Sequence, residues 1–152
     1  MRRKEKEITD KKEIQAIIRK SQICRLGLAD DGVPYIVPLC FGYRDNTLYF
    51  HSAREGRKIE MLKLNPQVCF EFDVDTQIHD GETACGWGMN YRSVIGYGTA
   101  SLIDDPADKR KALDIIMRQY AEEGEFTYSD KILEKTLVIK VEIRSMAGKK
   151  SG

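Results

Sequence analysis

The sequence has no excess of charge of either sign. Its 152 residues include 25 Lys and Arg against 24 Asp and Glu, which gives a formal net charge of +1 at pH 7. Proteins built mainly to hold nucleic acid carry a large surplus of cations, so this balance disfavours a nucleic-acid partner. The longest apolar stretch, residues 33–41, is far shorter than the ~20 residues of a membrane-spanning helix, so we expect no membrane partner.

Histidine and cysteine are scarce and scattered. The chain has 2 His and 4 Cys, no two cysteines form a C-x-x-C pair, and neither His lies at a zinc-ligand spacing from them, so we expect no metal site. Cys24 and Cys40 lie in apolar runs and are expected to be buried, whereas Cys69 should lie on the opposite face of its strand. The charged arm at residues 1–9 has no apolar region after it, so we expect no secretory signal and a cytoplasmic protein.

Known catalytic motifs are missing as well. The sequence contains no P-loop, no H-E-x-x-H motif, no Ser/His/Asp triad order and no paired-carboxylate motif. These absences disfavour hydrolases and kinases. Chemistry supplied by a bound cofactor is then the interpretation more consistent with the sequence.

Alternating apolar residues predict six strands, and most of the early connections are too short for parallel crossovers. Turns at residues 30–32 and 44–46 join the first three strands as hairpins. The pattern therefore predicts a mainly β fold with peripheral helices, arranged as a small closed or nearly closed antiparallel barrel. We expect a single domain, residues 1–152, with a C-terminal tail at 147–152. The expected strands cover residues 24–28, 33–43, 47–52, 68–74, 93–103 and 137–143.

Three helices are expected around the strands, at residues 10–20, 56–64 and 105–124. Ser52 and Glu55 have the spacing of a capping box for the second helix. A proline at the first position opens the third helix, and a glycine is expected to end it.

Two glycine-containing segments have alternative interpretations. Residues 76–92 read as a long loop, in which Trp87 and Tyr91 could form a mobile flap over a planar ligand or a dimer contact. Gly96 and Gly98 lie within an expected strand with no helix after them, so a bend is favoured over a dinucleotide-binding fingerprint.

The segment richest in groups that could bind a ligand is the turn from the third strand into the second helix. Gly56 would let a ligand approach the backbone, and Arg54, Arg57 and Lys58 place three cations at a helix start. The helix N-terminus has unsatisfied N–H groups, so a phosphate site is one interpretation, and an ordinary solvated basic turn is the other. His51 lies at the end of the strand beside this turn, as a structural hydrogen-bonding residue or as a proton-exchanging one.

Four motifs occur in an order that resembles a known family. They are VPYIVPL at residues 33–39, LYFHSA at 48–53 followed by EGRK at 55–58, LNP at 64–66 with VCFE at 68–71, and SVIGYG at 93–98. Together they resemble the FMN-binding split-barrel superfamily related to pyridoxamine 5′-phosphate oxidase, and within it the nitroimidazole-resistance subgroup. The resemblance implies a six-stranded antiparallel Greek-key split β-barrel and a homodimer with FMN at the subunit interface.

The resemblance also implies roles for individual residues. Arg57 and Lys58 match the basic pair that holds the FMN phosphate, and Ser52 and Gly56 lie on the same turn. His51 matches a histidine near the flavin and is the candidate catalytic residue that contacts a small-molecule substrate. The remaining cofactor-binding matches are backbone and side chains flanking the isoalloxazine ring, at Val37, Pro38, Leu39, Ser93 and Val94.

The function that this resemblance implies is an FMN-dependent oxidoreductase that reduces small electrophilic substrates such as nitroaromatics. A protein that binds flavin or haem without turnover is the alternative, and an interaction module acting through the N-terminal arm is a third. The chain ends without the Arg-bearing basic segment of the true oxidases, so oxidation of vitamin B6 is not expected.

Overall fold

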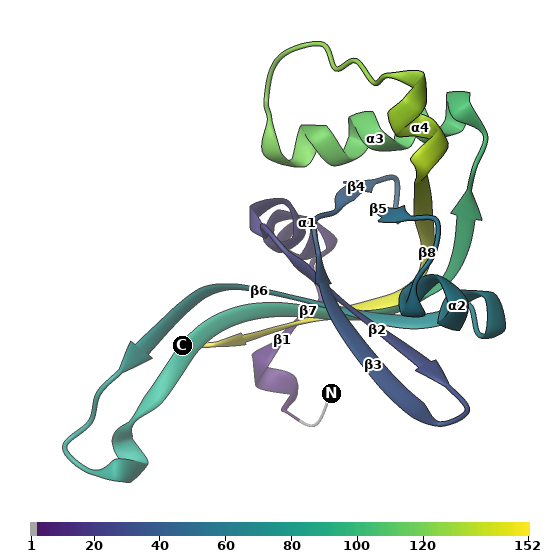
Figure 1. Ribbon diagram of the computed structural model, residues 1–152. Coiled ribbons are helices and arrows are strands. Elements are labelled where there is room, and N and C mark those ends of the chain that lie inside the picture. The colour runs from purple at the N-terminus through teal and green to yellow at the C-terminus, as the bar shows by residue number, and fades with distance from the viewer. Residues whose placement is uncertain (1–2) are drawn as a thin grey trace.

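The computed structural model describes residues 3–152, which form one antiparallel sheet with helices around it (Figure 1). The sheet has eight strands, in the order β3-β2-β6-β7-β8-β5-β4 with β1 paired to β8 outside this path. The strands are β1 (Glu7–Ile8), β2 (Cys24–Asp30), β3 (Val33–Leu39), β4 (Gly42–Arg44), β5 (Thr47–Ala53), β6 (Gln67–His79), β7 (Gly88–Ile103) and β8 (Thr136–Ser151). The helices are α1 (Lys11–Lys20), α2 (Arg57–Leu64), α3 (Pro106–Tyr120) and α4 (Asp130–Lys135), with two short 3-10 turns, η1 (Lys4–Lys6) and η2 (Ala84–Gly86).

Two tight hairpins are confirmed. Asp31 and Gly32 join β2 to β3 with φ of 47° and 77°, and Asp45 and Asn46 join β4 to β5 with φ of 49° and 57°. Left-handed backbone at both central residues matches the twist of the flanking strands, and Asp, Asn and Gly tolerate it. These local signals fix the antiparallel pairing at both ends of the sheet.

The expected strand at residues 33–43 is wrong as one element, because it divides into β3 and β4. At the division the Phe41 ring is buried, and the Phe41 N–H donates to the Tyr120 hydroxyl at 3.0 Å. Cys40 is exposed rather than buried, since its neighbour Phe41 takes the core position. β3 and β4 are the two ends of the strand path, so the sheet is open rather than a closed barrel of six strands. Pro34 and Pro38 have no N–H to donate, which suits β3 to an edge.

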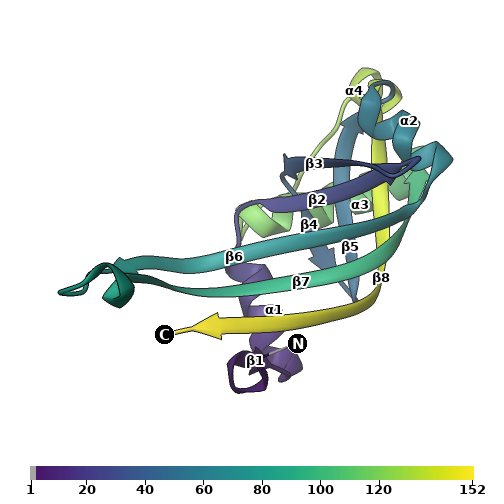
Figure 2. The same ribbon diagram turned by 90° about the horizontal axis from the view of Figure 1, so that it is seen from below.

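The sheet curls because one of its two longest strands, β8, belongs to two layers. β8 pairs with β7 along most of its length and with β5 over Thr136–Glu142, and Figure 2 shows it turning from the layer of β6 and β7 toward that of β4 and β5. The bend expected at Gly96 and Gly98 is confirmed. The β7–β8 register shifts between Tyr97 and Gly98, and a Cβ on Gly96 would lie 2.2 Å from the Phe70 ring.

The expected long loop at residues 76–92 is wrong, because most of it is strand. β6 and β7 continue past the end of β8 as a two-stranded arm that projects from the body in both ribbon views (Figures 1 and 2). Ile78 lies opposite Met89 within the arm. Gly81 and Gly86 hold its tip together, since a Cβ on Gly81 would lie 2.5 Å from the Gly86 carbonyl carbon. The glycines that suggested a loop instead permit this close approach.

Both ends of the described chain are tied into the sheet. The tail expected at residues 147–152 is wrong up to Ser151, because these residues finish β8 and pair with β7. Glu7 and Ile8 of the expected charged arm pair with Lys149 and Gly148, and Ile8 is buried. Residues 1 and 2 of that arm lie outside the described residues.

The helices enclose two clusters of buried side chains. α1 packs on β6 and β7 and contributes three isoleucines to the main core, while α3 packs on β4 and β5. Ala112, Leu113 and Ile116 of α3 meet Leu133 of α4 and Val138 of β8 in the second cluster. α3 ends at Tyr120, before the expected Gly124, because the backbone of Ala121 is extended, with φ of −129° and ψ of 116°. The Ala121 N–H still makes the last helical bond, to the Met117 carbonyl at 2.8 Å.

A buried lysine fastens α3 to α4. Lys109 is 2% exposed, and its Nζ pairs with Asp104 at 3.1 Å and donates to the Thr136 carbonyl at 3.1 Å and to the Leu133 carbonyl. Leu133 and Thr136 are at the end of α4, where helix carbonyls lack partners within the helix. The ammonium group therefore satisfies the end of α4 and orients it on the sheet.

Replacing Lys109 with methionine is expected to lower the free energy of unfolding by about 3 kcal/mol, because the buried carbonyls and Asp104 lose a charged donor. Urea denaturation followed by circular dichroism measures the loss. Lys111→Met, an exposed lysine on the same helix, is the control and should change stability by less than about 0.5 kcal/mol. Equal effects of the two variants would contradict the fastening role of Lys109.

Candidate functional site

The turn that opens α2 leaves backbone donors exposed. Gly56 is its N-cap, with φ of 122° and no side-chain cap, so the capping box expected from Ser52 and Glu55 is wrong. The first helical bonds run from the N–H groups of Ile59 and Glu60 to the Gly56 carbonyl, at 3.0 and 3.1 Å. The N–H groups of Arg57 and Lys58 precede these bonds, at the positive end of the helix dipole. A Cβ on Gly56 would meet nothing within 4 Å, so the turn is open to a ligand.

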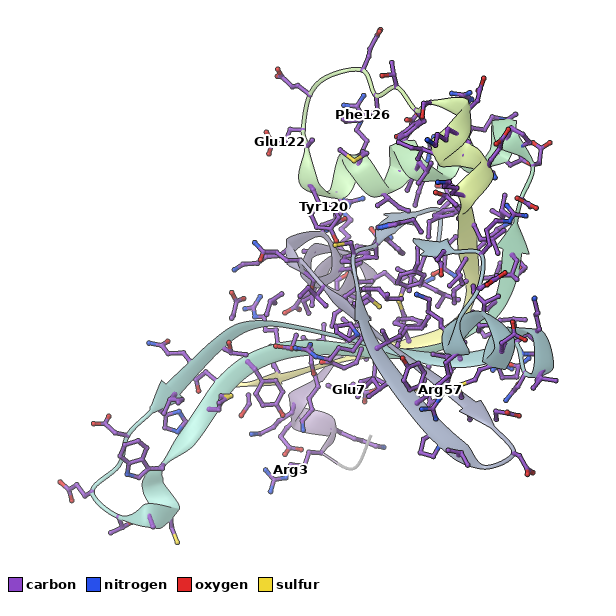
Figure 3. The ribbon with its side chains drawn as sticks, in the orientation of Figure 1. Arg3, Glu7, Arg57, Tyr120, Glu122 and Phe126 are labelled. Carbon is purple, nitrogen blue, oxygen red and sulfur yellow. The ribbon has the colours of Figure 1, made fainter. Side chains whose placement is uncertain are left out.

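Two cations stand at this turn without an acidic partner. Within residues 3–152, neither Arg57 nor Lys58 forms an ion pair. Lys58 is half-buried, and burial lowers the pKa of its ammonium group. The Arg57 guanidinium lies over the Tyr35 ring, 4.5 Å from its centroid, and Figure 3 shows it at the start of α2 beside β3. A partly desolvated lysine without a counter-ion is less stable charged than in water, so an anion bound here would stabilise it.

Arg54, the third cation of the expected cluster, is engaged elsewhere. Its guanidinium donates to both Asp104 oxygens, at 2.7 and 2.5 Å, and to the Glu134 carbonyl at 2.9 Å. These hydrogen bonds hold the pKa of Asp104 well below its usual range. The interpretation of three cations facing one anion is therefore wrong, and two remain.

The structure places the other predicted residues of this region on β3 and β5. Val37 and Leu39 are half-buried on β3 and Pro38 is exposed between them. On β5, His51 is exposed and lies opposite Val138, whereas the next residue, Ser52, is buried on the other face. The Arg57–Tyr35 contact joins β3 to the α2 turn.

Ser93 and Val94 are not brought to this turn within one chain. Both lie on β7, and β2 and β6 separate β7 from β3. Three strand spacings of ~4.8 Å give a separation of about 14 Å. Val94 is fully buried in the core, and Ser93 is nearly so.

Tyr35 is the residue of this region that sequence reasoning missed. It alternates with Val37 and Leu39, and all three pack against the main core. The alternation could have placed Tyr35 on the same strand face as the predicted pair. Its contact with Arg57 depends on packing between segments 22 residues apart, which the local pattern does not contain.

One face of the sheet carries exposed apolar side chains, and we call it the outer face. Tyr97 lies opposite Cys69, Cys69 opposite Gly27, and Gly27 opposite Ile36 in one row across β7, β6, β2 and β3. Tyr97 and Ile36 are 54% and 64% exposed, and Ile95, two residues before Tyr97, is 51% exposed. Apolar patches of this kind mark interaction surfaces more often than free solvent-facing surface.

Two features are absent from residues 3–152. No helix in this range is both long enough and apolar enough to cross a membrane. No three His, Cys, Asp or Glu side chains in the same range come together as metal ligands would.

Comparisons with known proteins place this geometry in context. The sequence profile described as pyridoxamine 5′-phosphate oxidase matches residues 10–150. A solved structure from Bacteroides thetaiotaomicron VPI-5482, described as a candidate 5-nitroimidazole antibiotic resistance protein, is 41% identical with a TM-score of 0.85, over 95% of this chain and 86% of that one.

More distant structures share the fold. They include the flavocytochrome Anf3 from Azotobacter vinelandii (22% identity, TM-score 0.87, 100% of this chain and 72% of that one) and an FAD and heme binding protein from Mycobacterium smegmatis (20%, 0.84, 96% and 73%). A curated relative, the uncharacterized protein RA0666 of Rhizobium meliloti (strain 1021), is 31% identical over 64 residues. That match spans 42% of either chain, less than half of the relative's length.

Proposed function

The chain belongs to the pyridoxamine 5′-phosphate oxidase family, and from this premise we propose that it is a flavin-binding oxidoreductase. FMN is the proposed cofactor, and small electrophilic molecules such as nitroaromatics are the proposed substrates. The relative from Bacteroides thetaiotaomicron, at 41% identity, supports this substrate class. The haem named for the Mycobacterium smegmatis protein is not carried over, because 20% identity supports the fold alone.

The observation that carries the proposal is the pair of unpaired cations at the open turn of α2. A flavin phosphate needs hydrogen-bond donors and positive charge, and the Arg57 and Lys58 side chains and backbone N–H groups supply both. Gly56 leaves room for the phosphate to approach, and the Ser52 hydroxyl lies shortly before the turn. The donor set therefore fits the group.

When bound, the flavin would supply the electron-transfer chemistry, and this chain's residues would bind and orient it. We assign the backbone of Val37, Pro38 and Leu39 to the side of the isoalloxazine ring, since β3 is an edge strand joined to the phosphate turn through Tyr35. His51 is exposed and is assigned to substrate contact, where it could hold or give a proton.

The functional unit in this proposal is a homodimer with flavin at the interface. Ser93 and Val94 lie too far from β3 to serve the same flavin within one chain, so a second copy would supply this strand. The outer face, with Tyr97 and Ile95 exposed, is the surface that a second copy would cover.

Turnover tests the proposal. The flavin-loaded protein should oxidise NADH or NADPH only when a nitroaromatic or quinone is added. The loss of nicotinamide absorbance measures this oxidation. Failure with every acceptor tried, in a protein that holds flavin, would replace the oxidoreductase with the flavin-storage alternative.

Replacing His51 with alanine should lower kcat/KM for the electrophile by about a hundredfold, the low end of what a positioned proton donor contributes. Flavin affinity should stay within about twofold of the parent value, because His51 is not among the phosphate donors. His79→Ala, which changes the other histidine of the sequence, is the matched control. A loss of flavin affinity equal to the loss of kcat/KM would show that His51 binds the flavin instead of the substrate.

A further inference from the structure

The arm formed by residues 76–90 has one apolar face, and this face continues the outer face of the sheet. Within the arm Ile78 lies opposite Met89, so both side chains lie on the same face. Side chains alternate along β7, which places Met89 on the face of Ile95 and Tyr97. Ile78 and Met89 are 64% and 45% exposed. The outer face therefore extends from the body of the sheet along β7 onto the arm.

A bulge at Asp75 brings Ile78 onto this face. Val74 is buried in the core, and strict alternation along β6 would turn Ile78 toward the same side as Val74. β6 carries one extra residue between Val74 and Gln77, where the register shifts and Asp75 has φ of 57°. The extra residue reverses the alternation, so Ile78 faces outward and the polar Gln77 and His79 take the other face. Bulges re-aim side chains in this way at functional surfaces.

Within residues 3–152, no segment covers the apolar face of the arm. β8 stops opposite Tyr91, and both ribbon views show the arm clear of the helices (Figures 1 and 2). A two-stranded hairpin on its own is marginally stable in water, because two strands bury little apolar surface. Trp87, which follows the short turn η2 at the tip, is 59% exposed. The arm therefore presents apolar side chains that suit a surface outside its own chain.

The position of the arm favours a second copy of this chain as that surface. The arm and the outer face share the strand β7, so a copy that covers Tyr97 and Ile95 also meets the arm. A stable interface takes roughly 20–30 residues from each partner. The body of the outer face presents Ile36, Ile95 and Tyr97 as exposed large apolar side chains, and the arm adds Ile78, Trp87 and Met89.

The same strand leads from the arm to the proposed flavin site. In the proposed homodimer, Ser93 of one copy lies beside the flavin that the other copy holds. Tyr91 and Met89 lie two and four residues before Ser93 on the same strand face, about 7 and 14 Å along β7. The arm therefore begins where the flavin of the second copy would lie.

We propose that the arm of each copy crosses onto the other copy and forms the outer wall of its substrate pocket. This inference rests on the proposed function, because the pocket lies over the proposed flavin. Tyr91 and Met89 face the ring, and Ile78 and Trp87 pack on the body of the second copy. Aromatic and thioether side chains suit flat, electron-poor molecules, so the arm selects which acceptors reach the ring.

Sedimentation velocity of the flavin-free protein tests the contact between the arm and the second copy. Met89→Asp should raise the dissociation constant of the homodimer by about a hundredfold, since a two-fold interface contains the contact twice and each copy contributes about tenfold. Gln77→Asp adds the same charge on the polar face of the arm, and this matched control should change the constant by less than about twofold. An unchanged constant in Met89→Asp, an equal change in both variants, or a monomeric parent would overturn the contact.

A mixed dimer tests whether the arm serves the other copy. One subunit has residues 75–91 replaced by an Asn-Gly turn, and the other carries Arg57→Ala and Lys58→Ala with its arm intact. The homodimer of the shortened subunit should release flavin about tenfold faster than the parent, measured by the recovery of flavin fluorescence on dilution. The mixed dimer should release its flavin at the parent rate, because the intact arm covers the intact site.

Release from the mixed dimer as fast as from the shortened homodimer would overturn the proposal, because the arm would then act on its own chain. Met89→Asp in place of the shortened arm gives the same comparison if the shortened subunit does not fold. A parent protein that binds no flavin would overturn the proposed function itself. The sedimentation result, measured without flavin, would then still decide whether the arm contacts a second copy.

Discussion

Replacing Arg57 and Lys58 together with alanine is expected to weaken FMN binding by about a thousandfold. Each cation would donate charge-assisted hydrogen bonds to the phosphate, and such bonds contribute about 1.5–3 kcal/mol each. A combined loss of about 4 kcal/mol corresponds to three factors of ten in Kd. The Arg57 change also removes the group stacked on Tyr35, which holds the turn against β3. Fluorescence titration of the flavin-free variant measures the effect.

Two other cations serve as controls. Lys63→Ala removes an exposed lysine from the same helix, where it pairs with Glu60 at 3.6 Å, and should leave FMN affinity within about twofold. Arg54→Ala should also have a small effect on FMN affinity, because the Arg54 guanidinium already donates hydrogen bonds to Asp104 and to the Glu134 carbonyl. If Arg54→Ala costs as much as the double variant, the phosphate has been assigned to the wrong cations.

Replacing Tyr97 with aspartate is expected to raise the dissociation constant of the proposed homodimer by about a thousandfold. A two-fold interface contains each residue twice, so one substitution acts at two places. A buried aromatic anchor contributes about 2 kcal/mol or more at an interface, and the two copies together reach about 4 kcal/mol. Tyr97 is 54% exposed in the single chain, so the separated subunits should keep their fold.

Sedimentation velocity across a range of protein concentrations measures this dissociation. Ile132→Asp, on α4 and away from the outer face, is the control and should leave the dimer intact. A Tyr97→Asp protein that stays dimeric at the lowest concentrations would place the interface on another surface. A parent protein that is monomeric throughout would remove the need for a second copy at the flavin site.

Local sequence signals predicted the parts of the fold that depend on a few neighbouring residues. The hairpin at Asp31 and Gly32 needs only residues that tolerate left-handed backbone. The start of α1 needs only Asp10, whose carboxylate accepts the Lys12 N–H at 3.0 Å. The Gly96 bend needs a residue without a side chain where Phe70 packs. A glycine within a strand pattern is itself a signal for such a bend or close approach.

The parts that were missed depend on residues far apart in the chain. The division between β3 and β4 is fixed by the Tyr120 hydroxyl, 79 residues from the Phe41 N–H that it accepts. The arm formed by β6 and β7 is polar and rich in glycine, so its composition resembles a loop, and its own cross-strand pairing makes it a hairpin. The extension of β8 to Ser151 depends on pairing with Tyr91, which the alternation of single strands does not reveal.

The candidate site shows the same division. The strand-to-helix turn, with Gly56 before the helix and Arg57 and Lys58 after it, was predicted because all of its parts are contiguous. Arg54 was assigned wrongly because its partner, Asp104, is 50 residues away. The three cations lie at one turn because they are close in sequence. Hydrogen bonds between distant segments determine which of these cations remain available to bind a ligand.

Whether the α2 turn holds a flavin can be decided by titrating the flavin-free protein with FMN. We expect saturable binding at one flavin per chain, with a shifted visible absorption spectrum and quenched fluorescence. The Arg57→Ala, Lys58→Ala double variant should lose this binding while its circular dichroism stays that of the parent. A folded parent protein that leaves the spectrum of added FMN unchanged would contradict the claim.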